Sequence, residues 1–133
     1  MKDNVALIVT SLLSILLMTL HMTGDTIRAR AGTPEAGGST LIVVPILVVW
    51  LYGTLVLGER RSGHVLMLVG SLLALGMPIL HVMGAEGIFH VQLARSGPAF
   101  LFVWTLHALG VTGMFSLILS VQGLWRLRRS QSR

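Results

Sequence analysis

Four long apolar stretches limit this chain to very few folds. They cover residues 4–23, 40–57, 64–82 and 98–125, and none of them contains Asp, Glu, Lys or Arg. A helix needs about 20 mostly apolar residues to cross the hydrocarbon core of a bilayer, and each stretch comes close to that length. The sequence therefore predicts an all-α fold, an integral membrane four-helix bundle, with residues 1–133 forming a single transmembrane domain.

The composition agrees with a lipid environment. Hydrophobic residues make up 53% of the chain and charged residues 11%, whereas about 25% of the residues of a soluble domain are charged. The chain has no cysteine, which excludes disulfides, thiolate metal sites and a cysteine nucleophile. The net charge is +5, and the charged residues lie between and beside the apolar stretches. We therefore interpret the positive charge as a topology signal and expect no nucleic-acid partner.

The basic residues predict the orientation. About six residues separate the second and third spans, which favours a tight antiparallel hairpin. With four crossings, seven basic residues fall on one side and three on the other: Lys2, Arg60, Arg61, Arg126, Arg128, Arg129 and Arg133 against Arg28, Arg30 and Arg95. This bias predicts a multi-pass protein of the cell membrane with both termini inside. A cleaved signal peptide ending near residues 29–31 is the alternative, but that position is too far downstream.

The chain also shows signs of an internal repeat. A shift of sixty positions aligns residues 9–14 (VTSLLS) with residues 69–74 (VGSLLA), and it continues without a gap until His21 meets His81. Gly24 then meets Gly84, and Trp50 corresponds to Trp104 at a different offset. The pattern indicates two duplicated helical hairpins in a parallel repeat, related by an axis along the membrane normal.

Small residues recur at four-residue spacing and predict close helix packing. Such pairs let helix backbones approach each other in membranes. The predicted packing residues are Thr10, Ser14, Gly70, Ala74, Ala108, Thr112, Ser116 and Ser120. The last four form a ridge along the fourth span, for which we expect either a contact inside the bundle or self-association.

Five polar residues are expected to gather at the outer end of the bundle. His21 lies seven residues after Ser14 and therefore on the same helix face; the cluster comprises His21, Asp25, His81, Glu86 and His90. Three interpretations stay open: histidines that hydrogen-bond carbonyls or water, a metal site built from imidazole and carboxylate ligands, and a proton or ion pathway. The cofactor is therefore unknown, with a metal ion as one candidate.

His107 is expected near the middle of the membrane. An unpaired polar group is costly at that depth, and Tyr52 or Thr54 of the second span lie at a comparable depth. A buried hydrogen bond is the default interpretation. Haem ligation is not expected, because His107 has no evident second histidine opposite it.

Residues 48–63 (VVWLYGTLVLGERRSG), with Leu20 and His21 upstream and residues 102–104 (FVW) downstream, carry a resemblance over nearly the whole chain. The sequence resembles a group of small bacterial four-helix membrane proteins of unassigned function. The resemblance implies a bacterial cytoplasmic membrane and four helices, and it implies no activity.

Two functions remain after this reading of the sequence. The first is a non-enzymatic membrane module that associates with itself or with another membrane protein and binds a small ligand or ion at its outer end. The alternative is a small transporter or channel for a metal ion or protons. An enzyme is less favoured, since no catalytic signature is present.

Overall fold

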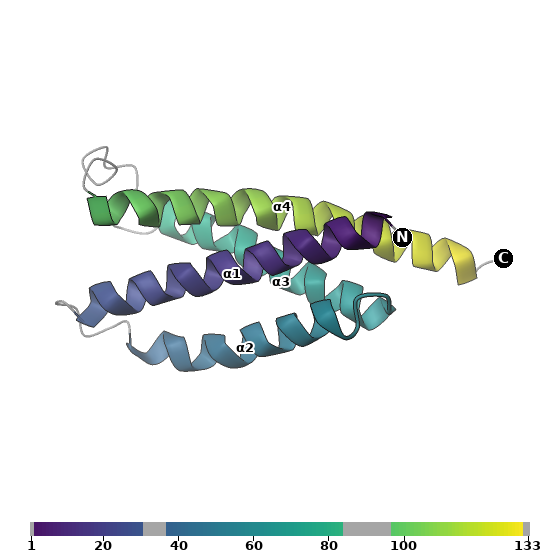
Figure 1. The fold of residues 1–133 in the computed structure, drawn as a ribbon, viewed down its shortest axis with the longest axis horizontal. Helices are drawn as coiled ribbons and strands as arrows, with labels where there is room; N and C mark the ends of the chain where they lie inside the picture. Colours follow the sequence, from purple (N-terminus) through teal and green to yellow (C-terminus); the bar gives the residue numbers. More distant parts are fainter. Residues whose placement is uncertain (1, 31–36, 84–96, 132–133) are drawn as a thin grey trace.

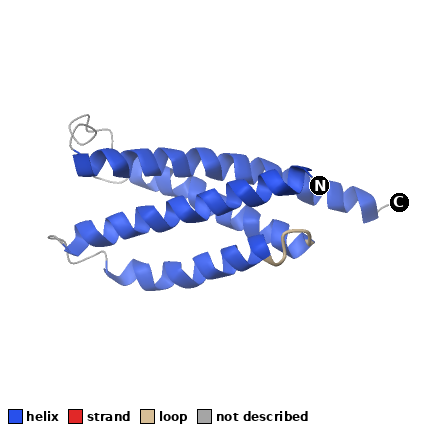
Figure 2. Cartoon of the chain, viewed as in Figure 1, coloured by secondary structure: helices blue, strands red, loops and turns tan. Residues whose placement is uncertain are grey.

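The computed structural model describes residues 2–30, 37–83 and 97–131, and all of its regular structure there is helical (Figure 2). The four helices are α1 (Lys2–Arg30), α2 (Gly37–Leu55), α3 (Arg61–Met83) and α4 (Gly97–Gln131). They run alternately up and down along one long axis (Figure 1). The predicted all-α fold with four helices is confirmed.

The helices form a bundle in which α1 and α3 each contact the other three helices. Within the bundle, α3 packs along α4. α2 lies against α1 and α3, and within the described ranges it does not touch α4. Both termini and the turn between α2 and α3 lie at the same end (Figure 1). We call this the basic end, because it carries Arg60, Arg61, Arg126, Arg128 and Arg129.

Three of the helices are long and apolar enough to cross a bilayer. Their qualifying segments are Asn4–Gly24, Arg61–Leu80 and Val103–Arg129. α2 contains a shorter apolar stretch, Ile42–Leu55, which spans about 21 Å at 1.5 Å per residue. One helix continues well beyond its predicted end: α1 passes through Gly24 and Asp25 to Arg30. Nothing in that segment removes a backbone donor, so a helix can leave the apolar zone without breaking.

The exterior of the bundle is apolar on every helix. Large side chains at least half exposed include Val5 on α1, Val48 on α2, Leu72 on α3 and Val111 on α4. In water such a surface would be unstable, because soluble monomers rarely expose large continuous apolar patches. The interior, in contrast, contains small and hydroxylated residues. This distribution is the one expected where lipid surrounds the helices and close packing joins them.

The α3–α4 contact is built on glycine and serine. A Cβ atom placed on Gly113 would lie 2.9 Å from Ala74 Cβ, and one placed on Gly110 would lie 3.1 Å from Pro78 Cγ. Between these points and the basic end, Ser71 Oγ and Ser116 Oγ are 2.8 Å apart. Because glycine has no side chain and serine has a small one, the two backbones lie close together along most of their length.

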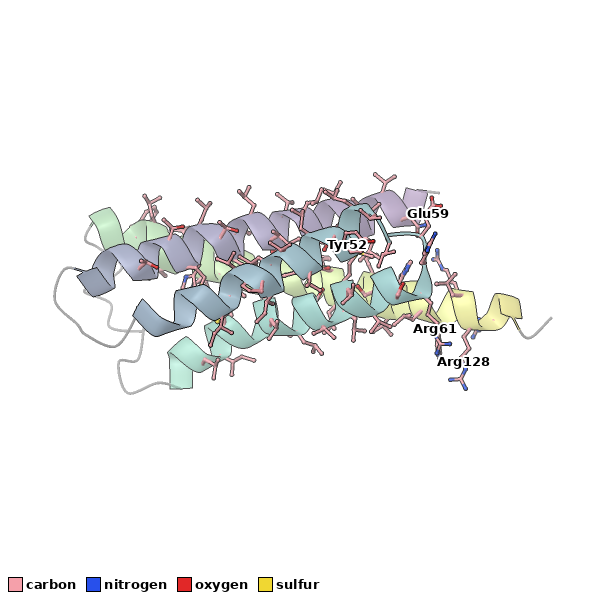
Figure 3. All side chains as sticks on the ribbon, turned by 90° about the horizontal axis from the view of Figure 1, so that it is seen from below. Tyr52, Glu59, Arg61 and Arg128 are labelled. Carbon is pink, nitrogen blue, oxygen red and sulfur yellow. The ribbon has the colours of Figure 1, made fainter. Side chains whose placement is uncertain are left out.

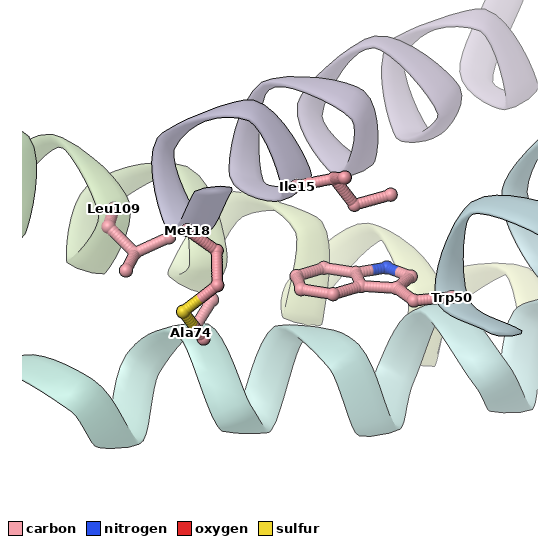
Figure 4. Close-up of a cluster of buried hydrophobic side chains, with 5 residues drawn as sticks. All are labelled: Ile15, Met18, Trp50, Ala74 and Leu109. Carbon is pink, nitrogen blue, oxygen red and sulfur yellow. The ribbon is translucent and has the colours of Figure 1, made fainter. Parts of the chain in front are cut away.

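Trp50 of α2 fills the centre of the bundle. Its side chain is 2% exposed and lies in a cluster with Ile15, Met18, Ala74 and Leu109 (Figure 4). Gly70 of α3 faces the indole directly, and a Cβ atom there would collide with the ring. Trp50 thus attaches α2 to the other helices through a large buried contact.

Candidate functional site

Hydroxyl groups link the helices in the bundle interior. Trp50 Nε1 donates to Ser11 Oγ at 2.9 Å, and Ser11 Oγ lies 2.8 Å from Thr54 Oγ1. Thr54 in turn donates to Trp50 O at 2.9 Å. This set, which we call the Ser11 network, joins α1 to α2, as Ser71 and Ser116 join α3 to α4. Every donor in the network has an acceptor. The network therefore joins the helices without the free-energy penalty of a buried, unpaired polar group.

The predicted packing residues lie as follows. Ser14, Gly70, Ala74, Ser116 and Ser120 are buried, whereas Thr10, Ala108 and Thr112 are half-buried. Thr10 and Thr112 each donate to the carbonyl four residues earlier on their own helix, at 2.9 Å. Ser120 Oγ is buried without a hydrogen-bond partner among the described residues. The α4 ridge is thus divided between the α3 contact and positions nearer the surface.

Most of the predicted outer cluster lies outside the described residues. His21 sits on α1 with its side chain 1% exposed. The backbones of Asp25 and His81 belong to α1 and α3, but their side chains, and all of Glu86 and His90, fall outside the description. Among the residues that are described, no three His, Asp or Glu side chains come together to hold a metal ion. The metal site therefore stays a prediction.

His107 faces outward from α4. Its side chain is exposed, and Nδ1–H donates to Val103 O on the same helix at 2.7 Å. The two expected partners lie elsewhere: Thr54 is engaged in the Ser11 network, and Tyr52 is 53% exposed on α2, which does not reach α4 in the described ranges. Since the carbonyl can only accept, Nδ1 carries the proton and Nε2 keeps a lone pair directed away from the bundle.

His107 belongs to a regular row of exposed side chains. We call this row the α4 stripe, and it consists of Phe100, Trp104, His107, Val111, Met114, Ile118, Val121 and Trp125. Successive members are separated by four and three residues in strict alternation, which is the heptad spacing of a helix that packs along another helix. His107 is the one polar member of the row.

A cavity of about 100 Å³ opens at the basic end. Its polar lining comes from four places: Asn4 on α1, Glu59 in the α2–α3 turn, His64 on α3, and Gln122 and Arg126 on α4. Figure 3 shows Glu59, Arg61 and Arg128 together at this end of the bundle. We call this cavity the headgroup pocket after its position at the basic end, where the predicted spans reach the lipid headgroups. A second hollow of about 250 Å³ lies between α2 and α3 and is lined almost entirely by apolar side chains such as Pro45 and Leu73.

Sequence reasoning did not single out His64 as a site residue. The imidazole is 2% exposed, and Nδ1–H donates to Arg60 O at 3.0 Å. The ring rests against Gly123 of α4, where a Cβ atom would collide with it. The only available signal was a glycine near the end of the fourth span, and glycine alone does not identify its neighbour.

Comparison of the chain with protein-family models, with curated proteins and with solved structures found no match. The resemblance over residues 48–63 is therefore still an expectation.

Proposed function

We propose that this protein is a non-enzymatic membrane module that works by associating with a second copy of itself through the α4 stripe. The observation that carries the proposal is the exposed imidazole of His107, about 15 Å along α4 from its start at Gly97. A polar group at such a depth is stable when it meets a partner, because lipid tails offer no hydrogen bond.

The stripe itself offers a matching partner. Trp104 is 60% exposed, and no hydrogen bond from its indole N–H falls within the described residues. Two copies with the same topology are related by a two-fold axis along the membrane normal, so their α4 helices run parallel. Trp104 and His107 are one helical turn apart, so the Trp104 N–H of each copy can reach His107 Nε2 of the other. Both hydrogen bonds form at once, because the interface is symmetric.

The wider architecture is part of the same proposal. α2 makes the fourth crossing, with both termini and the α2–α3 turn inside, as the seven-to-three basic bias favours. The duplication is supported by Ser11 and Ser71, which correspond under the sixty-residue shift and each pair with a hydroxyl of the following helix. Trp50 and Trp104 differ, since the first is buried and the second exposed.

Transport of protons or metal ions is the alternative, and one observation favours it. Eight polar side chains are buried in the part of the bundle that the structure describes: Ser11, Ser14, His21, Thr54, His64, Ser71, Ser116 and Ser120. Most of the hydroxyls are already paired with each other or with carbonyls, such as Ser71 with Met67 O at 2.6 Å. Fixed pairs of this kind hold helices together and leave few groups to pass an ion, so association is the better-supported function.

Cysteine cross-linking tests the proposed interface. The chain contains no cysteine, so single substitutions across positions 103–118 of α4 report only on their own positions. We expect disulfide-linked dimers in membranes to peak at Val111 and Ile118 and to be at background at the fully buried Leu109. His107→Phe should weaken dimerisation about 10-fold or more, as two membrane hydrogen bonds of about 0.6–2 kcal/mol each imply. Equal cross-linking around the whole helix would contradict the proposal.

Topology is tested separately. We expect single cysteines at Ser62 and at Ala36 to react with a membrane-impermeant maleimide from opposite sides of the membrane, with Ser62 accessible only from inside. Lysed vesicles, in which both sites react, serve as the control. Labelling of both residues from one side in intact vesicles would show that α2 does not cross.

A further inference from the structure

The headgroup pocket is a cavity with a mixed charge pattern. Leu7, Leu119 and Leu127 form apolar walls, while Glu59 and Arg126 contribute opposite charges at its edge. Binding sites for small ligands typically combine an apolar lining with a few convergent polar groups. This pocket lies at the basic end, where a membrane-spanning bundle meets the lipid headgroups and where Arg129 Cζ lies 5.0 Å from the Trp125 ring centroid. Aromatic and basic residues of this kind mark the interface.

His64 is a polar side chain in the pocket lining. Its Nδ1–H is used by Arg60 O, so the neutral ring has a lone pair on Nε2. No hydrogen bond to Nε2 falls within the described residues, and His64 is among the residues that line the cavity. Nε2 can therefore accept a hydrogen bond from a ligand with a donor group, such as an ammonium. A fully deprotonated anion has no hydrogen to donate.

We propose that the headgroup pocket binds a group that carries both a phosphate and a primary ammonium, of the phosphoethanolamine type. The ammonium donates to the Glu59 carboxylate and to His64 Nε2. The phosphate accepts from the Arg126 guanidinium and from the side-chain amides of Asn4 and Gln122. These are charge-assisted hydrogen bonds, which are about twice as strong as neutral ones.

The size of the pocket agrees with this ligand. A volume of about 100 Å³ equals the liquid volume of about three water molecules, which is enough for an aminoethyl group with the phosphate at the opening. A phosphocholine group fits less well, because its quaternary ammonium has no hydrogen to donate to His64 or Glu59. The inference rests on the bundle lying in a bilayer and is independent of pairing through the α4 stripe.

Lipid retention in native mass spectrometry tests this inference on the full chain. The purified protein is exchanged into equal mixtures of phosphatidylethanolamine, phosphatidylcholine and phosphatidylglycerol, and bound lipid is counted. We expect phosphatidylethanolamine to be retained at least about 10-fold more than phosphatidylcholine, as the loss of the hydrogen bonds to Glu59 and His64 implies. Glu59→Gln should remove this preference and favour phosphatidylglycerol, whereas Arg126→Gln should reduce retention of all three.

Arg128→Gln is the matched control, because it removes the same charge at the same end but from outside the pocket. The Arg128→Gln variant should retain each lipid as well as the unmodified protein does. Equal retention of phosphatidylethanolamine and phosphatidylcholine by the unmodified protein, or equal losses in Arg126→Gln and Arg128→Gln, would overturn the inference. Circular dichroism and α4 cross-linking should be unchanged in all variants, which separates this test from that of the proposed function.

Competition with soluble phosphoethanolamine shows whether the pocket recognises the headgroup alone or also needs the acyl chains of a lipid. If the site recognises the headgroup alone, millimolar phosphoethanolamine should displace the lipid, and Glu59→Gln should abolish the displacement. If the acyl chains contribute along the apolar helix surfaces, the lipid should stay bound. Both outcomes support the pocket, and displacement by inorganic phosphate alone would overturn the role of the ammonium.

Discussion

Gly70→Leu is expected to destabilise the bundle by about 3 kcal/mol, since overfilling a packed core costs about 1–3 kcal/mol and occasionally more. The reason is the position of the Trp50 indole, which lies where a Cβ atom at residue 70 would be. The ring is rigid and is held by its hydrogen bond to Ser11 at 2.9 Å. It therefore cannot move aside without breaking that bond and separating α2 from α1 and α3.

Gly76→Leu is the matched control for this effect. Both glycines lie on α3, but a Cβ atom at Gly76 meets nothing within 4 Å. The substitution there should be neutral or stabilise the helix by up to about 1 kcal/mol, because glycine is a poor helix former. The measurement is the midpoint of SDS-induced unfolding in mixed micelles, followed by tryptophan fluorescence. Similar midpoints for the two variants would mean that Trp50 does not pack on Gly70.

The existence of the four helices could be predicted because apolar length is a direct consequence of bilayer thickness. Helix ends were less predictable. The first span was predicted to end at residue 23, yet α1 continues to Arg30, because a helix that leaves lipid needs no special residue to continue in water. The second span was predicted as residues 40–57, whereas α2 covers Gly37–Leu55 and its apolar part begins only at Ile42.

Most contacts between helices could not be predicted from the sequence. In a soluble helix the apolar face marks the core, but here lipid and core are both apolar, so the rotation of each helix is poorly determined. Small residues such as Gly70 and Ser116 correctly drew attention to packing positions, although their neighbours were unknown. The pairings of Trp50 with Ser11 and of His64 with Gly123 depend on how all four helices are rotated relative to one another. His107 was expected inside for the same reason.

Ser11→Ala is expected to destabilise the bundle by about 1–3 kcal/mol, which is the cost of a buried donor without an acceptor. The substitution removes the acceptor of the Trp50 N–H and the neighbour of Thr54 Oγ1. Thr54 is less affected, because it still donates to Trp50 O at 2.9 Å. Ser14→Ala provides the comparison: Ser14 is equally buried on the same helix, but it bonds only to Thr10 O of its own turn. It should cost no more than about 0.5 kcal/mol, the lower end for a hydrogen bond.

A double-mutant cycle with Trp50→Phe separates the hydrogen bond from the loss of volume. Phenylalanine has no N–H, so once it replaces Trp50 the removal of Ser11 Oγ should cost less. The cycle should give a coupling energy of about 0.6–2 kcal/mol, the range found for hydrogen bonds between membrane helices. The SDS titration of all four proteins is followed by circular dichroism, because Trp50→Phe removes one of the tryptophans. If the two substitutions add without coupling, Trp50 is held by its packing, and its hydrogen bond to Ser11 does not help to join α2 to the bundle.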